Sequence, residues 1–359
     1  MPDPVRVAVV VLNWNGLQMT LECLAALRAQ TRPVDEIVVV DNASMHCEAD
    51  AIARVLGPND RLIRSATNRG FAGGANLALE RVLAERRCCH VALLNNDAVA
   101  EPGWLEALVR TAQADPSIGA VASKMVFFAD PQRIENAAVH LLSCGDNVPR
   151  GRGDLASAWD RPEDVLAFCG GAVLLRAAML ERIGLFRADF FANFEDVDLS
   201  LRAVTTGWRI RYEPGAVVRH HLNASILKIR SVEFDVRSVR NSTWAYFVNA
   251  PVELIFCNLP GLLLVNLALV LGLALTGRSA FAAAVVRGRW WAWCERHQIA
   301  AERDRLAALR RPGTHAMWQA QRAWWLEALA RLVPRGKFGR SSQTGAGTSR
   351  RQGLDTFIT

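Results

Sequence analysis

Residues 5–16 read VRVAVVVLNWNG, an almost uninterrupted apolar run that ends abruptly in a polar turn. Short apolar runs recur at residues 37–40, 61–65, 91–94 and 120–123, and helical patterns lie between them at 17–30, 49–56, 72–86 and 104–114. Strands that are apolar throughout, rather than on alternate residues, are typical of a parallel sheet covered by helices on both faces. The sequence therefore predicts an α/β fold with a Rossmann-like, mainly parallel sheet.

Polar turns follow the first four of these strands, at residues 13–16, 41–44, 68–76 and 95–97. Asn, Asp and Gly form turns and cap helices in any protein, so a single such turn indicates little. The carboxyl ends of parallel strands, however, meet at one edge of the sheet, and ligands bind there. Four polar turns in succession therefore predict a binding site for a polar ligand at this edge.

Composition limits what the chain can be. Its 359 residues suffice for one large or two ordinary domains, and a hydrophobic content of 51% excludes a disordered or fibrous protein for most of the length. The net charge of +7 is uneven, because the residues from Arg287 onward hold 14 Lys and Arg against 5 Asp and Glu. Such a segment is typical of contact with nucleic acid or membrane lipid, although a solvated arginine-rich face is the simpler alternative.

The cysteines and the first residues indicate the compartment. The eight cysteines show no CxxC pair and no zinc-ligand spacing, and residues 1–6 lead directly into a strand instead of a signal peptide. We therefore expect a reducing, cytoplasmic environment.

The second half of the sequence is less regular. Residues 127–163 lose the periodicity, and such long loops inside a domain are usually functional or mobile. A strand-like run with two internal glycines follows (LAFCGGAVLLR, 166–176), then FFANFEDVDLSLR at 190–202, a predicted strand at 208–212 and AVVRHH at 216–221. Residues 254–277 are uncharged and very apolar but interrupted by Pro260, residues 287–331 mix arginine with tryptophan, and residues 334–359 read as a disordered basic tail.

Seven motifs carry a resemblance to a known family. They are LNWNG (12–16), DNAS (41–44), NRGFAGGAN (68–76), LLNNDA (93–98), FCGGAVLLR (168–176), FEDVDLSLR (194–202) and the histidine after PGAVVR (214–219). In this order they resemble the family 2 glycosyltransferases, and most of all the bacterial rhamnosyltransferase-like branch, over roughly residues 5–250. The resemblance implies a GT-A fold, a nucleotide-diphosphate-sugar donor, a divalent cation (Mg2+ or Mn2+) and inversion at the anomeric carbon.

Under this resemblance the expected activity is transfer of a sugar, with rhamnose the leading candidate, to a hydroxyl of a cell-envelope or capsule glycan, free or lipid-linked. A nucleotidyltransferase or another nucleotide-binding α/β transferase is the alternative, but it would usually need a basic glycine-rich loop, which Arg69 alone does not supply. A nucleic-acid-binding protein is suggested by the basic, tryptophan-rich segment. That segment follows a long apolar stretch, which points to lipid, so we expect no nucleic-acid partner.

The metal prediction rests on Asp97 and His220. A departing diphosphate is stabilised by a divalent cation, which commonly takes one or two carboxylates together with phosphate and water. The family often has Asp-x-Asp at this strand end, whereas this chain has Asn95-Asn96-Asp97, which leaves one carboxylate. By resemblance His220 is the second metal or phosphate ligand, with the adjacent His221 as the competing assignment. The simpler alternative for Asp97 is a helix cap.

The catalytic prediction rests on Glu195 and Asp196. An acceptor hydroxyl must lose its proton as it attacks, so a carboxylate within hydrogen-bond reach is needed. By resemblance Asp196 is that general base, and Glu195 supports its position. The alternative is structural: Asn193 would cap the following helix, with Asp196 at its third position.

The remaining expectations concern substrate binding. Asp41 resembles the family's base- or ribose-binding carboxylate, because its oxygens can accept bonds from a ring NH or a ribose hydroxyl. Glycines in the third turn would let the backbone approach the donor. The predicted donor-binding residues are Asn13, Asn15, Asp41, Asn68, Gly70, Gly74, Asn76 and Asn96. By resemblance the acceptor side comprises Gly170, Gly171 and Arg240.

The predicted organisation is a catalytic domain at 1–250, an apolar and Arg/Trp-rich helical membrane-associating region at 251–333, and the tail at 334–359. We expect Pro260 to cut the apolar stretch and leave a helix too short for a simple span. A span would also put the basic segment outside, against the rule that cytoplasmic flanks carry the excess of Lys and Arg. The prediction is therefore a re-entrant or interfacial helix on the anionic inner face of the cell membrane.

Overall fold

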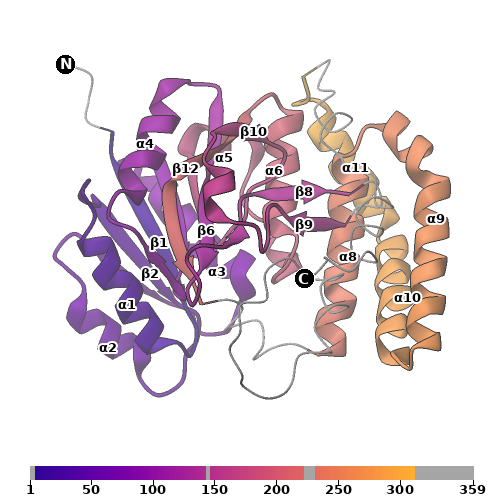
Figure 1. Cartoon of the computed structure of the whole chain (residues 1–359), viewed down its shortest axis with the longest axis horizontal. Coiled ribbons are helices and arrows are strands. Elements are labelled where there is room, and N and C mark those ends of the chain that lie inside the picture. Colours follow the sequence, from indigo (N-terminus) through magenta and orange to yellow (C-terminus); the bar gives the residue numbers. More distant parts are fainter. Residues whose placement is uncertain (1–4, 143–145, 222–230, 312–359) are drawn as a thin grey trace, which may run out of the picture.

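The computed structural model describes residues 5–142, 146–221 and 231–311, and its core is a mixed sheet covered by helices on both faces (Figure 1). Its strand order is β10-β12-β6-β11-β4-β1-β2-β3. The strands are β1 (Val7–Asn13), β2 (Glu36–Asp41), β3 (Arg61–Arg64), β4 (His90–Asn95), β6 (Ile118–Phe127), β10 (Glu163–Val165), β11 (Ala172–Arg176) and β12 (Arg209–His220). Two short strands join the sheet off this path: β5 (Ala98–Ala100) pairs with β12, and β7 (Ile134–Asn136) with β6.

The apolar first strand supplies two cores at once. Alternate residues of β1 point to opposite faces of the sheet. Val7, Val9 and Val11 belong to the core covered by α1 (Leu17–Arg28) and α4 (Trp104–Ala114), whereas Ala8 and Val10 belong to the core covered by α3 (Gly70–Glu85). This double burial explains why the strand has no polar face and confirms the predicted parallel arrangement of β4, β1, β2 and β3.

The structure adds detail where the periodicity fails. The segment after β6 contains β7, the hairpin of β8 (Val139–Leu141) and β9 (Asn147–Pro149), and β10. The strand expected at 208–212 continues to His220 as one long strand, β12, with a register shift between Glu213 and Val217. Pro214 and Gly215 cause this bulge without ending the strand. Of the expected strand at 166–176, only β11 is a strand, and Gly170-Gly171 precede it.

Four helices complete the described chain: α8 (Val232–Asn249), α9 (Val252–Leu275), α10 (Ser279–Cys294) and α11 (Arg296–Ala307). Helix α8 packs against both α6 (Glu195–Thr205) and α10, so it joins the sheet domain to the C-terminal helices (Figure 1). The expectation that Pro260 cuts the apolar stretch is wrong, because α9 continues through it. A proline removes only one intrahelical hydrogen bond and adds one steric clash with a backbone carbonyl group, and α9 stays helical in spite of both. The predicted tail, like the rest of 312–359, lies outside the described residues.

Candidate active site

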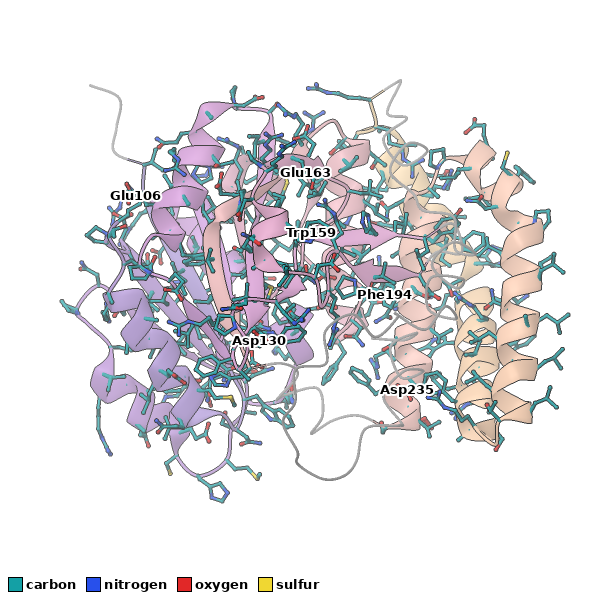
Figure 2. All side chains as sticks on the ribbon, in the orientation of Figure 1. Glu106, Asp130, Trp159, Glu163, Phe194 and Asp235 are labelled. Carbon is teal, nitrogen blue, oxygen red and sulfur yellow. The ribbon has the colours of Figure 1, made fainter. Side chains whose placement is uncertain are left out.

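A cavity of about 250 Å3 lies at the carboxyl edge of the sheet, where the polar turns meet helix α6. In Figure 2, Phe194, which lines it, lies between the sheet and the C-terminal helices. Many of the predicted site residues line this one cavity: Asn68, Gly70, Asn96, Asp97, Gly170, Gly171, Glu195, Asp196 and His220. Others do not: Asn13, Asn15, Asp41, Gly74, Asn76 and Arg240.

Asp97 and His220 face each other in the cavity. Asp97 directly precedes β5, and β5 pairs antiparallel with the end of β12, so the two side chains meet. His220 Nε2 lies 3.1 Å from Asp97 Oδ1. The adjacent His221 is turned away: its ring stacks on Phe128 at 3.6 Å, and its backbone N–H donates to the Asp97 carbonyl oxygen.

A third group at this place, Glu135, was missed by the sequence analysis. It lies on β7, and its Oε2 is 3.7 Å from His220 Nδ1. Burial opposes a charge on His220, but the hydrogen bond to Asp97 and the negative charges of Asp97 and Glu135 outweigh it and raise the histidine pKa to about 10. No motif marks Glu135, because only the pairing of β7 with β6 brings it here.

The donor set at this place can hold a divalent cation only together with a ligand. Within the described ranges, no group of three or more His, Cys, Asp or Glu side chains is arranged to hold a metal on its own. Asp97 nevertheless supplies one carboxylate, and His220 beside it would supply an imidazole once the cation displaces its proton. A cation of this type commonly completes its shell with substrate phosphates and water. The residues therefore fit a metal that binds with a diphosphate.

Asp196 and Glu195 begin helix α6 on the same cavity. The backbone N–H groups of Gly170 and Val197 donate to the two Asp196 oxygens, at 2.9 and 2.8 Å. Burial raises the pKa of Asp196, although these hydrogen bonds from the backbone N–H groups oppose the rise. Burial, together with the charge of Asp196, raises the pKa of Glu195 well above its usual range, and Glu195 Oε2 has no hydrogen-bond partner in the described part of the chain.

The capping alternative for this helix is wrong. The N-cap residue of α6 is Phe194, whose side chain cannot cap, and Asn193 instead donates to Ser238 Oγ of α8 at 3.0 Å. The chain before α6 is strained, since Phe191, Asn193 and Phe194 all have positive φ. Asn241 of α8 holds this loop by donating to the carbonyl oxygens of residues 190, 192 and 193.

The third turn shapes the wall of the cavity. Asn42 donates to Asn68 Oδ1 and to the Gly70 carbonyl oxygen, both at 3.0 Å, which fixes the turn before α3. Gly70 has φ of +68°, and a Cβ there would lie 2.2 Å from the Phe191 carbonyl oxygen. Only glycine therefore allows this turn to approach the strained loop. Asn42 and Trp14 line the cavity as well, although neither was among the predicted binding residues.

Several predicted donor ligands serve the framework in this structure. Asn13 is fully buried, and its amide donates to Asp41 Oδ1, Ser44 Oγ and Glu48 Oε2. Asn15 accepts from the Met45 N–H, and Asn76 exchanges two hydrogen bonds with Phe186. A Cβ at Gly74 would meet the Leu12 side chain at 2.7 Å. Sequence patterns identify such polar residues at strand ends, but they do not distinguish a lining group from a supporting one.

Arg240 does not line the cavity either. It is 3% exposed and bonds to Asp189, Glu295 and the side chain of Asn241. Its role in the structure is to join α8 to the segment before α6 and to the C-terminal helices. The acceptor function predicted for it has no support in this geometry, whereas Gly170 and Gly171 do line the cavity.

Comparison with known proteins identifies the family. The family model described as "Glycosyltransferase like family 2" matches residues 2–246. A pre-mycofactocin glycosyltransferase of Mycobacterium tuberculosis is 26% identical over 210 residues, which cover 58% of this chain and 40% of that protein. An N-acetylglucosaminyl-diphospho-decaprenol L-rhamnosyltransferase of the same species is 26% identical over 220 residues, 55% of this chain and 70% of that protein. The match therefore spans less than half of the first of these relatives.

The fold has counterparts among solved structures. One is GalNAc-T7, crystallised with UDP, GalNAc and Mn2+, with a TM-score of 0.56 and 14% identity; the match covers 69% of this chain and 48% of that one. At this identity the likeness concerns the fold alone, and that fold is GT-A.

Proposed function

The chain belongs to glycosyltransferase family 2 and is a glycosyltransferase, and on that premise we propose that it is a metal-assisted, inverting enzyme that uses a nucleotide-diphosphate sugar. The observation that carries this proposal is that Asp97, His220 and Asp196 line the same cavity. One part of that cavity suits a metal-bound diphosphate, and another supplies a base for the acceptor. The nucleotidyltransferase alternative is set aside, because the family assigns glycosyl transfer.

In the proposed reaction the acceptor oxygen attacks the anomeric carbon, and the bond from that carbon to the diphosphate breaks. Asp196 takes the proton of the attacking hydroxyl, held in place by the amides of Gly170 and Val197. A raised pKa suits this role, because a base works best near the ambient pH. Asp97 and His220 would hold the cation, which would stabilise the charge of the departing diphosphate.

The finer identity of the substrates is also proposed. We favour a deoxythymidine- or uridine-diphosphate sugar, with rhamnose first, and a cell-envelope glycan acceptor, free or lipid-linked. One relative is named as an L-rhamnosyltransferase acting on a decaprenol-linked sugar, which supports this choice. The reaction would then take place at the cytoplasmic side of the cell membrane, where nucleotide sugars are made.

The test is an assay of the purified full chain with a panel of nucleotide sugars and Mn2+, with release of nucleoside diphosphate as the readout. We expect turnover with at least one donor, its loss with a chelator, and its loss in Asp97→Asn. The matched control is Asp130→Asn, since Asp130 is an exposed carboxylate with its side chain 52% accessible. Normal turnover by Asp97→Asn at saturating Mn2+ would contradict the metal role.

A further inference from the structure

Helix α9 has its polarity reversed relative to a helix of a soluble domain. Its two asparagines point inward: Asn258 donates to Tyr246 Oη at 2.9 Å, and Asn266 accepts from Arg289 Nε at 3.0 Å. From Phe256 to Leu275 its outward side chains are apolar and exposed, namely Phe256, Leu259, Leu263, Leu264, Leu267, Leu271 and Leu275. The exposed Glu253 lies in the first turn, at the end of this stretch. A surface helix in water places these two classes the other way round.

The exposed apolar side chains are concentrated in one region. Of the sixteen large exposed hydrophobic side chains among the described residues, twelve lie between Val252 and Trp293. Figure 2 shows the side chains of α9 projecting outward from the edge of the molecule. Soluble monomers rarely expose apolar patches of this kind unless another surface covers them.

Helix α10 extends this surface. Val286, Trp290 and Trp293 are exposed and spaced to share one helix face. They lie on the side turned away from α8, because Gly288 faces α8 so closely that a Cβ would lie 2.6 Å from Val239 Cβ. Tryptophan is the residue most typical of a membrane–water interface.

We propose that this docking face, formed by the outward side chains of α9 together with Val286, Trp290 and Trp293 of α10, binds an anionic lipid bilayer with α9 lying in the membrane plane. A bilayer fits better than a protein partner, because the face is apolar from Phe256 to Leu275 with tryptophans beside it, and its one carboxylate, Glu253, lies at the end of the helix. The chain from Arg287 onward adds 14 basic against 5 acidic residues, which complements anionic headgroups.

The packing of α9 is the reason for an in-plane orientation. Arg289 contacts the middle of α9 through Asn266, and it also donates to Thr243 Oγ1 of α8 at 2.5 Å. Helix α8 in turn holds the loop before α6 through Asn241. If α9 crossed the bilayer in this arrangement, its middle would bring these polar groups and the catalytic domain to the bilayer centre. By length and composition α9 is able to span, but its contacts place it along the surface.

The first test measures flotation of the full chain with vesicles of 70% phosphatidylcholine and 30% phosphatidylglycerol. We expect binding, and an affinity about 100-fold or more lower in the double variant Leu263→Glu/Leu267→Glu, since each leucine contributes a factor of roughly ten or more when buried. The matched control is Leu155→Glu, because Leu155 is 54% exposed on the sheet domain. Unchanged thermal melting and donor hydrolysis in the double variant would show that folding and the active site are intact.

Two outcomes of this test overturn the proposal. One is equal vesicle binding by the double variant and the unmodified chain. The other is a dimer in solution that the double variant dissociates, with no vesicle binding by either protein, since a second copy of the chain would then cover the face. Failure of the proposed catalytic function is separate, because it would appear as absent donor turnover with vesicle binding retained.

The second test measures depth. Phe256, Leu263 and Ala274 project in nearly the same direction from α9 and are all exposed. Each is replaced in turn by a nitroxide-labelled cysteine in a full chain whose eight native cysteines are replaced and whose vesicle binding is first shown to be unchanged. An in-plane helix predicts equal depths at the three sites. A central label much deeper than the two outer ones would show a span and overturn the orientation.

Discussion

At the scale of single residues, two hydrogen bonds from backbone N–H groups hold the proposed base, Asp196, in position. Asp196→Asn keeps the shape of the side chain and removes the proton acceptor, so we expect kcat to fall by about 10²–10⁴ with little change in donor binding. Measurement of kcat and of nucleotide affinity checks this. Loss of binding and of thermal stability together, without a specific rate effect, would instead indicate a structural role.

The protonation of Asp196 gives a pH dependence. Because burial raises its pKa, the deprotonated base is lost as pH falls through a value above that of an ordinary aspartate. We expect the acid limb of the kcat/KM profile to have a midpoint above 3.8, the usual value. A profile that stays flat down to the ordinary aspartate range would argue against Asp196 as the base.

Glu135 is expected to orient His220 within the proposed metal site. Glu135→Gln removes the negative charge 3.7 Å from His220 Nδ1 but keeps its size. Removing the partner of a metal-binding histidine typically costs 10–100-fold in metal affinity, so we expect that loss for Mn2+ bound together with nucleoside diphosphate, measured by the spectrum of free Mn2+. Asp130→Asn serves again as the exposed control, and equal affinity in both variants would remove Glu135 from the site.

At the scale of elements, helix α8 carries the geometry of the active site without lining it. Asn241 donates to three carbonyl oxygens of the strained loop before α6. In Asn241→Asp the donor is lost but the shape is kept, and we expect about 2–3 kcal/mol of lost stability and a lower kcat, because the loop positions Glu195 and Asp196. Urea unfolding and kinetics check this against Ser242→Ala, a neighbouring position in the same helix. Wild-type kcat in Asn241→Asp would show that the loop keeps its conformation without α8.

At the scale of the whole molecule, His90 makes the fold sensitive to acid. It is buried in β4, and neither ring nitrogen has a hydrogen-bond partner in the described part of the chain. Burial, aided by the charges of Arg176 and Arg32, lowers its pKa to about 4 from the usual 6.5. A depressed pKa contributes stability above pH 6.5 that is lost as pH falls through about 4.

The difference corresponds to about 3 kcal/mol of unfolding free energy. We therefore expect His90→Phe to lose less stability than the unmodified chain between pH 7 and pH 4, as measured by urea unfolding at both values. Parallel losses in the two proteins would show that His90 is not the group responsible.

The pattern of the sequence alone was enough to predict the sheet and the edge of it at which the candidate site lies. Strands such as Val7–Asn13 are apolar on both faces because helices cover both faces of the sheet. The continuous run of apolar residues, without alternation, therefore predicts such a strand directly. Asp97 and Gly70 could be found for the same reason, since each lies in a turn that follows a strand whose limits come from local periodicity. Asp196 was assigned through the family resemblance. The assignment to glycosyltransferase family 2 came from the order of the motifs, and the family match confirms it.

Which polar residues reach the cavity depends on contacts between segments that are distant in the sequence. Asn13 and Asp41 lie at strand ends like Asp97, yet they bond to each other, and Asn13 also donates to Glu48 of α2 (Glu48–Val55). Glu135 comes to His220 through strand pairing, and Arg240 is buried by segments far from it in sequence. The sequence also did not predict which face of α9 packs against the rest of the protein. Composition shows that the helix is apolar, but the inward direction of its two asparagines depends on their hydrogen bonds to Tyr246 and Arg289. Contacts between distant segments leave no periodic pattern in the sequence, and for that reason they are seen only in the folded structure.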